Sequence, residues 1–351
     1  MTTRYDIDRD GLAELLADQP RYRVDQVWEG LWAQGREPAD LTNVPAAVRE
    51  RLAAALPSAL APVTESVTDD GATVKWLWEL ADGARVETVL MHYKDRSTVC
   101  VSTQAGCAMA CSFCATGQAG FERHLSVGEI VEQVVVARRR AAADRDGRRV
   151  GNVVFMGMGE PMANYDATWG AVERLHDDLG IGARHLTIST VGLVPGIRKL
   201  AEADLPVNLA VSLHAADDEL RDELVPVNRR WPLEDLMTAC EEYFDATHRR
   251  VSFEWALIAG VNDRPEDAVR LAALARRVRA HVNLIPLNPT PGYEVRGTSA
   301  AEVRRFRDQL LDAGVNVTVR DTRGTSIDAA CGQLRAGHEA TPVDRPRRRP
   351  S

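Results

Sequence analysis

The most constraining feature of this 351-residue chain is a repeated alternation of short β-branched runs with amphipathic stretches after residue 96. The runs have the length and composition of buried strands, and the stretches between them have the 3.6-residue period of helices. Six such units in succession predict an α/β fold whose parallel sheet is closed or partly closed into a (β/α)6 barrel. The expected strands are 98–103, 152–156, 185–190, 207–213, 251–258 and 281–287, and the expected helices are 127–143, 166–179, 233–247, 265–279 and 300–313.

An accessory region precedes the barrel. Residues 8–55 contain two or three short helical patterns, in which Trp28 and Trp32 are expected to pack a small core. Two strand patterns, 73–79 and 85–92, flank a turn at Ala81-Asp82-Gly83 and predict a β-hairpin. The predicted domains are therefore an N-terminal helical domain (1–70), a hairpin extension (71–96), the barrel with a C-terminal cysteine loop (97–338) and a disordered tail rich in Arg and Pro (339–351).

Composition indicates an ordinary globular protein, with 45% hydrophobic and 27% charged residues. The N-terminus has no apolar targeting segment and no window is long enough to span a membrane, so we expect a cytoplasmic protein with no membrane partner. A monomer is also expected. The net charge of -8 argues against nucleic-acid binding by charge alone. Local basic patches occur at 138–140 with 148–149, at 229–230 and at 345–349, and each is expected to be solvated surface.

Three cysteines are spaced Cys107-x3-Cys111-x2-Cys114, one thiolate short of a closed four-ligand metal site. The motif contains no His, and His124 is the nearest one downstream. A 4Fe-4S cluster held by three protein sulfurs would keep one iron open. The spacing, with an aromatic residue before the last cysteine, resembles the radical S-adenosylmethionine (SAM) superfamily, where the open iron binds the amino and carboxylate groups of SAM. A structural zinc site remains the alternative.

Polar and glycine motifs follow the expected strands, where parallel-sheet folds bind their ligands. After the second strand, Gly157-Met158-Gly159-Glu160 would bring a ligand close to the backbone and offer a carboxylate to a cationic amine. Further polar residues end the third, fourth and sixth strands. The predicted SAM-binding residues are Gly159, Glu160, Ser189, Ser212, Leu213, His214 and Asn288.

Four motifs together resemble the RlmN family of radical SAM RNA adenine methyltransferases. They are Gly-Cys-Ala-Met-Ala-Cys-Ser-Phe-Cys-Ala-Thr-Gly from 106, Met-Gly-Met-Gly-Glu-Pro from 156, Ser-Leu-His-Ala from 212 and Arg-Gly-Thr-Ser-Ile-Asp-Ala-Ala-Cys-Gly-Gln-Leu from 323. The last motif discriminates best, because the cysteine triplet alone fits many radical SAM enzymes. The resemblance runs from about residue 8 to residue 338. One departure is Ser189-Thr190-Val191-Gly192, where the family often has Ser-Thr-Ser-Gly.

The resemblance also implies roles for the other cysteines. One SAM would methylate Cys331, and a second SAM would be cleaved at the 4Fe-4S cluster to a radical that takes hydrogen from the new methyl group. The carbon radical would then add to C2 of an adenine. Cys100 matches the family's resolving thiol, which forms a disulfide with Cys331, and Glu87 matches the base that takes the C2 proton. Cys240 lies in an expected helix and is interpreted as core filling.

The implied substrates are an adenosine of 23S rRNA at the peptidyl-transferase centre and an adenosine next to the anticodon of tRNA. The implied electron donor is a flavodoxin-type protein. Two alternatives remain open at this point. The first is the sister activity that methylates C8 of the same rRNA adenosine, and the second is a non-catalytic RNA-binding protein whose cysteines hold zinc.

Overall fold

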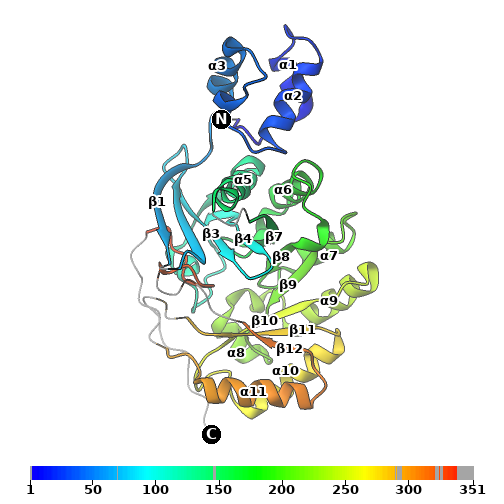
Figure 1. Ribbon diagram of the computed structural model, residues 1–351. Helices are drawn as coiled ribbons and strands as arrows, with labels where there is room; N and C mark the ends of the chain where they lie inside the picture. Colours follow the sequence, from blue (N-terminus) through cyan, green and yellow to red (C-terminus); the bar gives the residue numbers. More distant parts are fainter. Residues whose placement is uncertain are drawn as a thin grey trace.

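A computed structural model describes residues 2–68, 70–144, 148–288, 290, 295–320, 324 and 327–337. A ten-stranded sheet runs through it in the order β1-β2-β3-β4-β7-β8-β9-β10-β11-β12 (Figure 1). Neighbours from β4 to β12 are parallel, whereas β1 to β4 pair antiparallel. The parallel strands are β4 (Ser97–Cys100), β7 (Val150–Phe155), β8 (Leu186–Thr190), β9 (Asn208–Ser212), β10 (Ser252–Leu257), β11 (His281–Pro286) and β12 (Val317–Val319).

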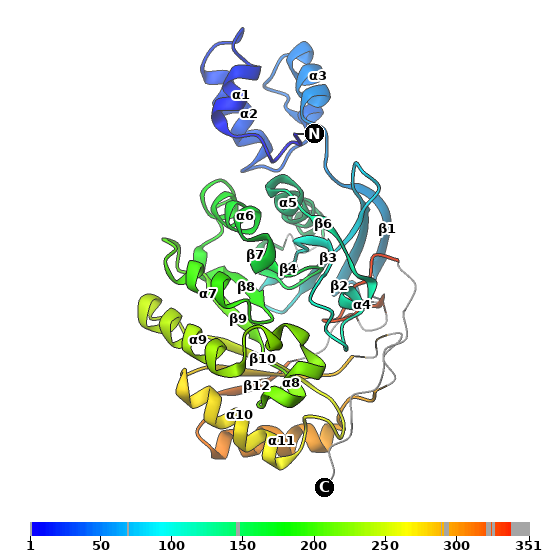
Figure 2. The same ribbon diagram turned by 180° about the vertical axis from the view of Figure 1, so that it is seen from behind.

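Helices cover the outer side of the parallel strands (Figures 1 and 2). The predicted α/β fold with a partial barrel is confirmed, because the six expected strands lie side by side in chain order. The sequence analysis missed β12, which has only three residues, and two short helices after β8 and β9. The helices are α5 (Val127–Ala143), α6 (Tyr165–Asp177), α7 (Val194–Ala201), α8 (Asp218–Leu224), α9 (Leu233–Thr247), α10 (Pro265–Arg277) and α11 (Ala300–Asp312).

The first strand of the barrel is shorter than expected. Strand β4 ends at Cys100 rather than at residue 103. The chain then forms β5 (Gln104–Gly106), which pairs antiparallel with β6 (Phe121–His124) in a separate two-stranded sheet. The three cysteines of the metal motif lie in the loop that connects these two short strands. The pairing of β5 with β6 therefore holds both ends of that loop in place.

Three helices build the N-terminal region, α1 (Arg9–Leu15), α2 (Tyr22–Leu31) and α3 (Ala46–Ala55). The expected core is confirmed, since the rings of Trp28 and Trp32 stack with centroids 5.1 Å apart and both side chains are buried. The indole Nε1 of Trp28 donates to Asp178 at 3.0 Å, just after α6. This bond fastens the helical region, which lies beyond α5 and α6 in Figure 1, to the barrel.

The predicted hairpin forms with the expected bounds, as β2 (Thr73–Glu79) and β3 (Arg85–His92). One expectation needs correction: β1 (Ala61–Val67), assigned above to the helical domain, is a strand paired with β2. Nearly all of its side chains are exposed, so it lacks the apolar alternation that marks a strand in sequence. The expected basic tail at 339–351 lies outside the described residues.

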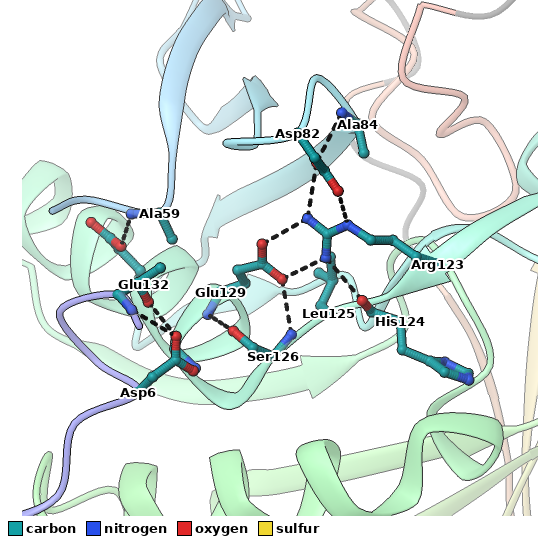
Figure 3. Close-up of polar contacts among 12 residues, drawn as sticks. Asp6, Ala59, Asp82, Ala84, Arg123, His124, Leu125, Ser126, Glu129 and Glu132 are labelled. Atoms are coloured by element: carbon teal, nitrogen blue, oxygen red, sulfur yellow. Dashed lines mark hydrogen bonds and ion pairs between the residues drawn. The ribbon is translucent and has the colours of Figure 1, made fainter. Parts of the chain in front are cut away.

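Helix α5 begins in a polar network that joins three parts of the chain (Figure 3). Arg123 in β6 binds both carboxylate oxygens of Glu129 at 2.8 Å and also pairs with Asp82 in the hairpin turn. Ser126 and Glu129 form a capping box, which satisfies two backbone N–H groups at the start of the helix. The strand that leaves the cysteine loop is thereby held against both the hairpin and α5.

The same helix is fastened to the N-terminal region. Asp6 accepts a hydrogen bond from Gly128 N at 2.6 Å, and Glu132 accepts one from Ala59 N at 2.7 Å (Figure 3).

Within the described ranges, no helix is both long and apolar enough to cross a bilayer.

Candidate active site

The three motif cysteines line one pocket at the carboxyl ends of the parallel strands, here called the cysteine pocket. Cys107 follows β5, and Cys114 is the N-cap of α4 (Ala115–Ala119). Leu213 is not a wall residue, because its side chain is fully buried in the core. The other predicted SAM-binding residues all line this pocket, namely Gly159, Glu160, Ser189, Ser212, His214 and Asn288.

The chemistry of these cysteines fits an iron–sulfur cluster. Burial raises the pKa of the Cys107 thiol to about 12 and that of Cys111 well above its usual range, and neighbouring cysteine charges act in the same direction. Thiolates in such a place need a cationic partner. In the described ranges, no three His, Cys, Asp or Glu side chains are arranged to hold one metal ion. The motif supplies three thiolates and no His, one ligand short of a closed zinc site, so it fits a cluster that keeps one iron open.

Glu160 is a buried carboxylate on the wall of the cysteine pocket, with only 2% of its surface exposed. Its two oxygens accept backbone hydrogen bonds from Met162 N at 3.0 Å and Val191 N at 2.9 Å. No basic side chain in the described part of the chain pairs with it, and burial raises its pKa to about 7. A cationic ligand would supply the missing charge, so the site fits the amino group of SAM.

Gly159 is required beside this carboxylate. Its φ is +102°, a region that L-residues rarely adopt, and an added Cβ would lie 2.6 Å from the Cβ of Gln104. The side chain of Gln104 accepts a hydrogen bond from Glu160 N at 2.8 Å. The glycine thus allows the close packing that orients Glu160.

His214 contributes a neutral imidazole to the wall. Burial lowers its pKa to about 3, with a smaller effect from the charge of Arg221. Its Nδ1 accepts a hydrogen bond from Ala256 N at 3.0 Å, so the ring proton sits on Nε2. The ring also packs edge-on against Phe113 of the cysteine motif, with centroids 4.6 Å apart. His214 therefore links the end of β9 to the cysteine loop.

Cys331 lies in the segment 327–337, here called the Cys331 loop. Cys331 is exposed and lines the cysteine pocket. Its backbone carbonyl accepts a hydrogen bond from Asn288 Nδ2 at 3.1 Å. Two further bonds join the loop to the cysteine motif: Ala115 N donates to Gly332 O at 2.8 Å and Thr116 Oγ1 to Leu334 O at 2.6 Å. The structure therefore docks this loop directly over the three cysteines.

A second, smaller pocket adjoins the first and contains Cys100, and we call it the Cys100 pocket. Cys331 lines both pockets, together with Asn288 and Arg320. Burial raises the pKa of the Cys100 thiol to about 12, and the nearby charge of Cys331 raises it further. The fold thus brings Cys100 and Cys331 together from positions 231 residues apart in the sequence.

Glu87 lies on β3 and lines neither pocket. Its buried carboxylate pairs with Lys75 Nζ at 3.1 Å and accepts a hydrogen bond from Arg335 N at 2.9 Å. Lys75 Nζ also donates to the carbonyl of Asp328 at 3.1 Å. The Cys331 loop is thereby fastened to the hairpin at both of its ends, with Glu87 directly beneath it.

Comparisons with known proteins agree with this geometry. Residues 101–272 match the radical SAM superfamily. A Salinispora tropica protein described as a probable dual-specificity RNA methyltransferase RlmN is 53% identical, with 94% of this chain and 92% of the relative covered. A Chloroflexus aurantiacus protein of the same description is 51% identical over 97% and 94%. The chain belongs to the RlmN family.

A solved structure supports the same assignment. The radical SAM methyltransferase of Sphaerobacter thermophilus superposes with a TM-score of 0.92 at 49% identity, covering 96% of this chain and all of that one. RlmN membership makes the chain a radical SAM RNA methyltransferase and implies a 4Fe-4S cluster and SAM as cofactors. Cys107, Cys111 and Cys114 would hold the cluster, and Glu160 with the strand ends would hold SAM.

Sequence reasoning missed two arginines of this RlmN site. Arg221 is fully buried on α8, where it donates to the carbonyls of Val191 at 2.5 Å and Leu213 at 3.1 Å. Burial lowers its pKa to about 10. Arg320 follows β12 and lies near Cys331, whose charge raises the pKa of the guanidinium. Neither arginine belongs to a recognisable motif, and Arg221 stands among acidic residues typical of an exposed helix.

Proposed function

We propose that this protein methylates C2 of an adenosine in 23S rRNA at the peptidyl-transferase centre and C2 of an adenosine adjacent to the anticodon in tRNA, with the thiol of Cys331 as methyl carrier. The observation that carries the proposal is the position of Cys331 on the shared wall of the cysteine pocket and the Cys100 pocket. A carrier thiol must meet the methyl donor in one place and a resolving thiol in another, and this position serves both.

Each residue has a separate task in this scheme. The cluster and SAM, when bound, supply radical chemistry able to remove hydrogen from an unactivated methyl group. Cys331 accepts a methyl group from one of two SAM molecules used per turnover and presents it at the pocket. Glu87 takes the C2 proton once the Cys331 loop moves away from it, since Arg335 N and Lys75 occupy its oxygens in the docked state.

Release of the product needs a second thiol. The adduct formed by radical addition must first give up one electron, which the oxidised cluster would accept. The thiolate of Cys100 then attacks the sulfur of Cys331, and the bond between that sulfur and the transferred carbon breaks with its electron pair on the carbon, which takes up a proton to become the product methyl group. A disulfide between Cys100 and Cys331 remains and must be reduced before the next turnover. The proposal also includes a flavodoxin-type electron donor, a monomeric enzyme and a cytoplasmic location, where rRNA and tRNA are found.

The deciding experiment is peptide mass spectrometry of anaerobically reconstituted protein incubated with methyl-labelled SAM. We expect a labelled methyl group on Cys331, none in Cys331→Ala, and full labelling of Cys331 in the control Cys240→Ala, because Cys240 is buried in the core. An unlabelled Cys331 in wild-type protein with an intact cluster would contradict the carrier role.

Two further measurements separate the alternatives. Cys100→Ala should be labelled on Cys331 and should then accumulate a covalent protein–RNA adduct, visible on a denaturing gel, because no thiol releases it. Nucleoside analysis of the wild-type product should show 2-methyladenosine; 8-methyladenosine would assign the chain the sister activity. A colourless protein containing zinc and no iron would overturn both readings.

A further inference from the structure

A large cavity opens at the amino ends of the parallel strands, opposite the cysteine pocket, and we call it the basal cavity. Its volume is about 1550 Å³, and its wall is built from the first residues of β7 to β11, the C-terminal half of α5 and the loop after α2. It meets the cysteine pocket at Met156, Glu254 and Arg320, which line both. No task in the proposed reaction uses this end of the barrel.

The wall of the basal cavity carries a strong excess of positive charge, although the whole chain has a net charge of -8. Eight arginines line it, against two acidic residues, Asp95 and Glu254. Both acids are already paired, with Arg96 at 3.3 Å and Arg320 at 3.5 Å. The arginines are Arg96, Arg138, Arg139, Arg148, Arg149, Arg184, Arg250 and Arg320.

Four of these arginines have no carboxylate partner among the residues that the structure describes: Arg138, Arg149, Arg184 and Arg250. Arg138 donates only to the carbonyl of Leu179, at 3.1 Å. Burial lowers the pKa of its guanidinium, and the charge of Arg149 lowers it further. Cations gathered in this way repel one another, so an anion between them would stabilise the arrangement.

The size and chemistry of the basal cavity select the class of anion. Small-molecule pockets are mostly apolar and hold about 300–1,000 Å³, whereas this cavity is larger and rich in arginine, Asn and Thr. The unpaired arginines come from α5 and from the segments before β7, β8 and β10, which spaces their charges around the rim. Guanidinium groups bind phosphate oxygens through paired hydrogen bonds, and a spaced row of them fits consecutive phosphates.

We infer that the basal cavity is a second RNA-binding site, which grips backbone phosphates of the substrate away from the adenosine that reacts. This inference rests on the proposed function, because it assigns the RNA of that reaction to a second contact. An acidic protein could also meet these arginines, but protein interfaces normally include an apolar core. The excess of eight arginines over two acidic residues on a concave wall favours a phosphate chain.

The test is RNA binding by full-length reconstituted protein, measured by fluorescence anisotropy with a labelled rRNA fragment over a range of KCl concentrations. The variant Arg149→Gln/Arg184→Gln/Arg250→Gln removes three exposed charges from the cavity wall. Its matched control, Arg276→Gln/Arg304→Gln/Arg305→Gln, removes three exposed charges from α10 and α11. Thermal unfolding of both variants checks that each is folded.

We expect the cavity variant to bind RNA about tenfold or more weakly, and the slope of log K against log salt to fall by about two to three. The control should keep the wild-type slope. Equal slopes for cavity variant and wild type would overturn the inference, as would an equal loss in the control. If the cavity variant bound RNA normally but bound inorganic tripolyphosphate more weakly, the basal cavity would be a small-anion site. If it bound RNA normally but was reduced more slowly by an acidic donor protein, the cavity would be a protein-docking site.

The failure of this inference is distinguishable from failure of the proposed function. If wild-type Cys331 carried no labelled methyl group, the proposed reaction would be contradicted, but the salt dependence of RNA binding could still be measured. Normal labelling of Cys331 with no effect of the cavity variant on RNA binding would remove only the second site.

Discussion

The carboxylate of Glu87 and the backbone N–H of Arg335 are joined by a 2.9 Å hydrogen bond although 248 residues separate them in the chain. Lys75 strengthens this junction, since its ammonium pairs with Glu87 at 3.1 Å and donates to the carbonyl of Asp328 at 3.1 Å. The hairpin therefore holds the Cys331 loop on both sides of Cys331. In the docked position of the loop, both oxygens of Glu87 are occupied.

Replacing Glu87 should loosen the Cys331 loop. In Glu87→Gln the acceptor loses its charge, and charge-assisted hydrogen bonds exceed neutral ones by about 1–2 kcal/mol. We expect the Arg335 amide to exchange with deuterium about tenfold faster in hydrogen-exchange measurements. The control is Glu79→Gln on the same hairpin, which breaks only an exposed pair with Arg85. Equal exchange at Arg335 in all three proteins would show that the junction contributes nothing to docking.

The buried Glu160 should make the cofactor-free protein less stable as pH rises. Its pKa in the fold is about 7, raised from 4.5 by burial, so the neutral form is favoured in the native state. This stabilisation is complete below about pH 4.5 and is lost as pH rises through about 7, with a total on the order of 3 kcal/mol. Denaturant unfolding across this range should show the loss in wild type and a flatter profile in Glu160→Gln; parallel profiles would contradict it.

Two glycine substitutions should differ sharply in cost. Gly159→Ala combines a positive φ with a Cβ placed 2.6 Å from the Cβ of Gln104, so we expect a loss of about 2–5 kcal/mol. Gly180→Ala also has a positive φ, +69°, but its new Cβ would meet nothing within 4 Å, and about 1–2 kcal/mol should be lost. Chemical unfolding measures both. Isothermal titration with SAM should show weakened binding only for Gly159→Ala, because Gln104 orients Glu160.

Loss of Arg221 should destabilise the wall of the cysteine pocket. Its guanidinium supplies hydrogen bonds to carbonyls at the ends of two strands, and each buried acceptor left unpaired costs about 1–3 kcal/mol. Arg221→Gln should therefore lose about 3 kcal/mol or more in denaturant unfolding. Arg229→Gln, an exposed neighbour in sequence, should change stability by less than about 0.5 kcal/mol. Similar small effects for both variants would show that the hydrogen bonds from Arg221 to the two carbonyls contribute little to stability.

Periodicity sufficed to predict the architecture, because buried strands and amphipathic helices impose their period directly on the sequence. Both strands of the hairpin, α5 and α9 have the predicted bounds. Strand β1 was not predicted because its exposed side chains show no alternation of apolar and polar residues. Strand β12 was not predicted because three residues are too few to show such an alternation. Both strands are held in place by pairing with a neighbour rather than by their own burial, whereas the missed helices α7 and α8 are only eight and seven residues long.

The candidate site could be predicted in part. The rule that ligands bind at carboxyl ends of parallel strands brought Glu160, Ser189 and His214 to one pocket, as the structure shows. The positions of Glu87 and Cys331 relative to each other depend on a contact between the hairpin and the C-terminal loop, and no local pattern encodes such a contact. The basal cavity could not be predicted from the sequence, because the net charge of -8 does not show which arginines lie close together in the fold.

The pairing of β3 with β4 places Val89 opposite Cys100 in a continuous sheet, so Glu87 and Cys100 have a fixed spacing. The hairpin is consequently part of the barrel's own sheet and not a separate attachment. A truncated protein beginning at residue 97 would expose the edge of β4 and lose the contacts that anchor the Cys331 loop. Residues 73–100 therefore act as one structural unit, and a designed chimaera has to carry them together.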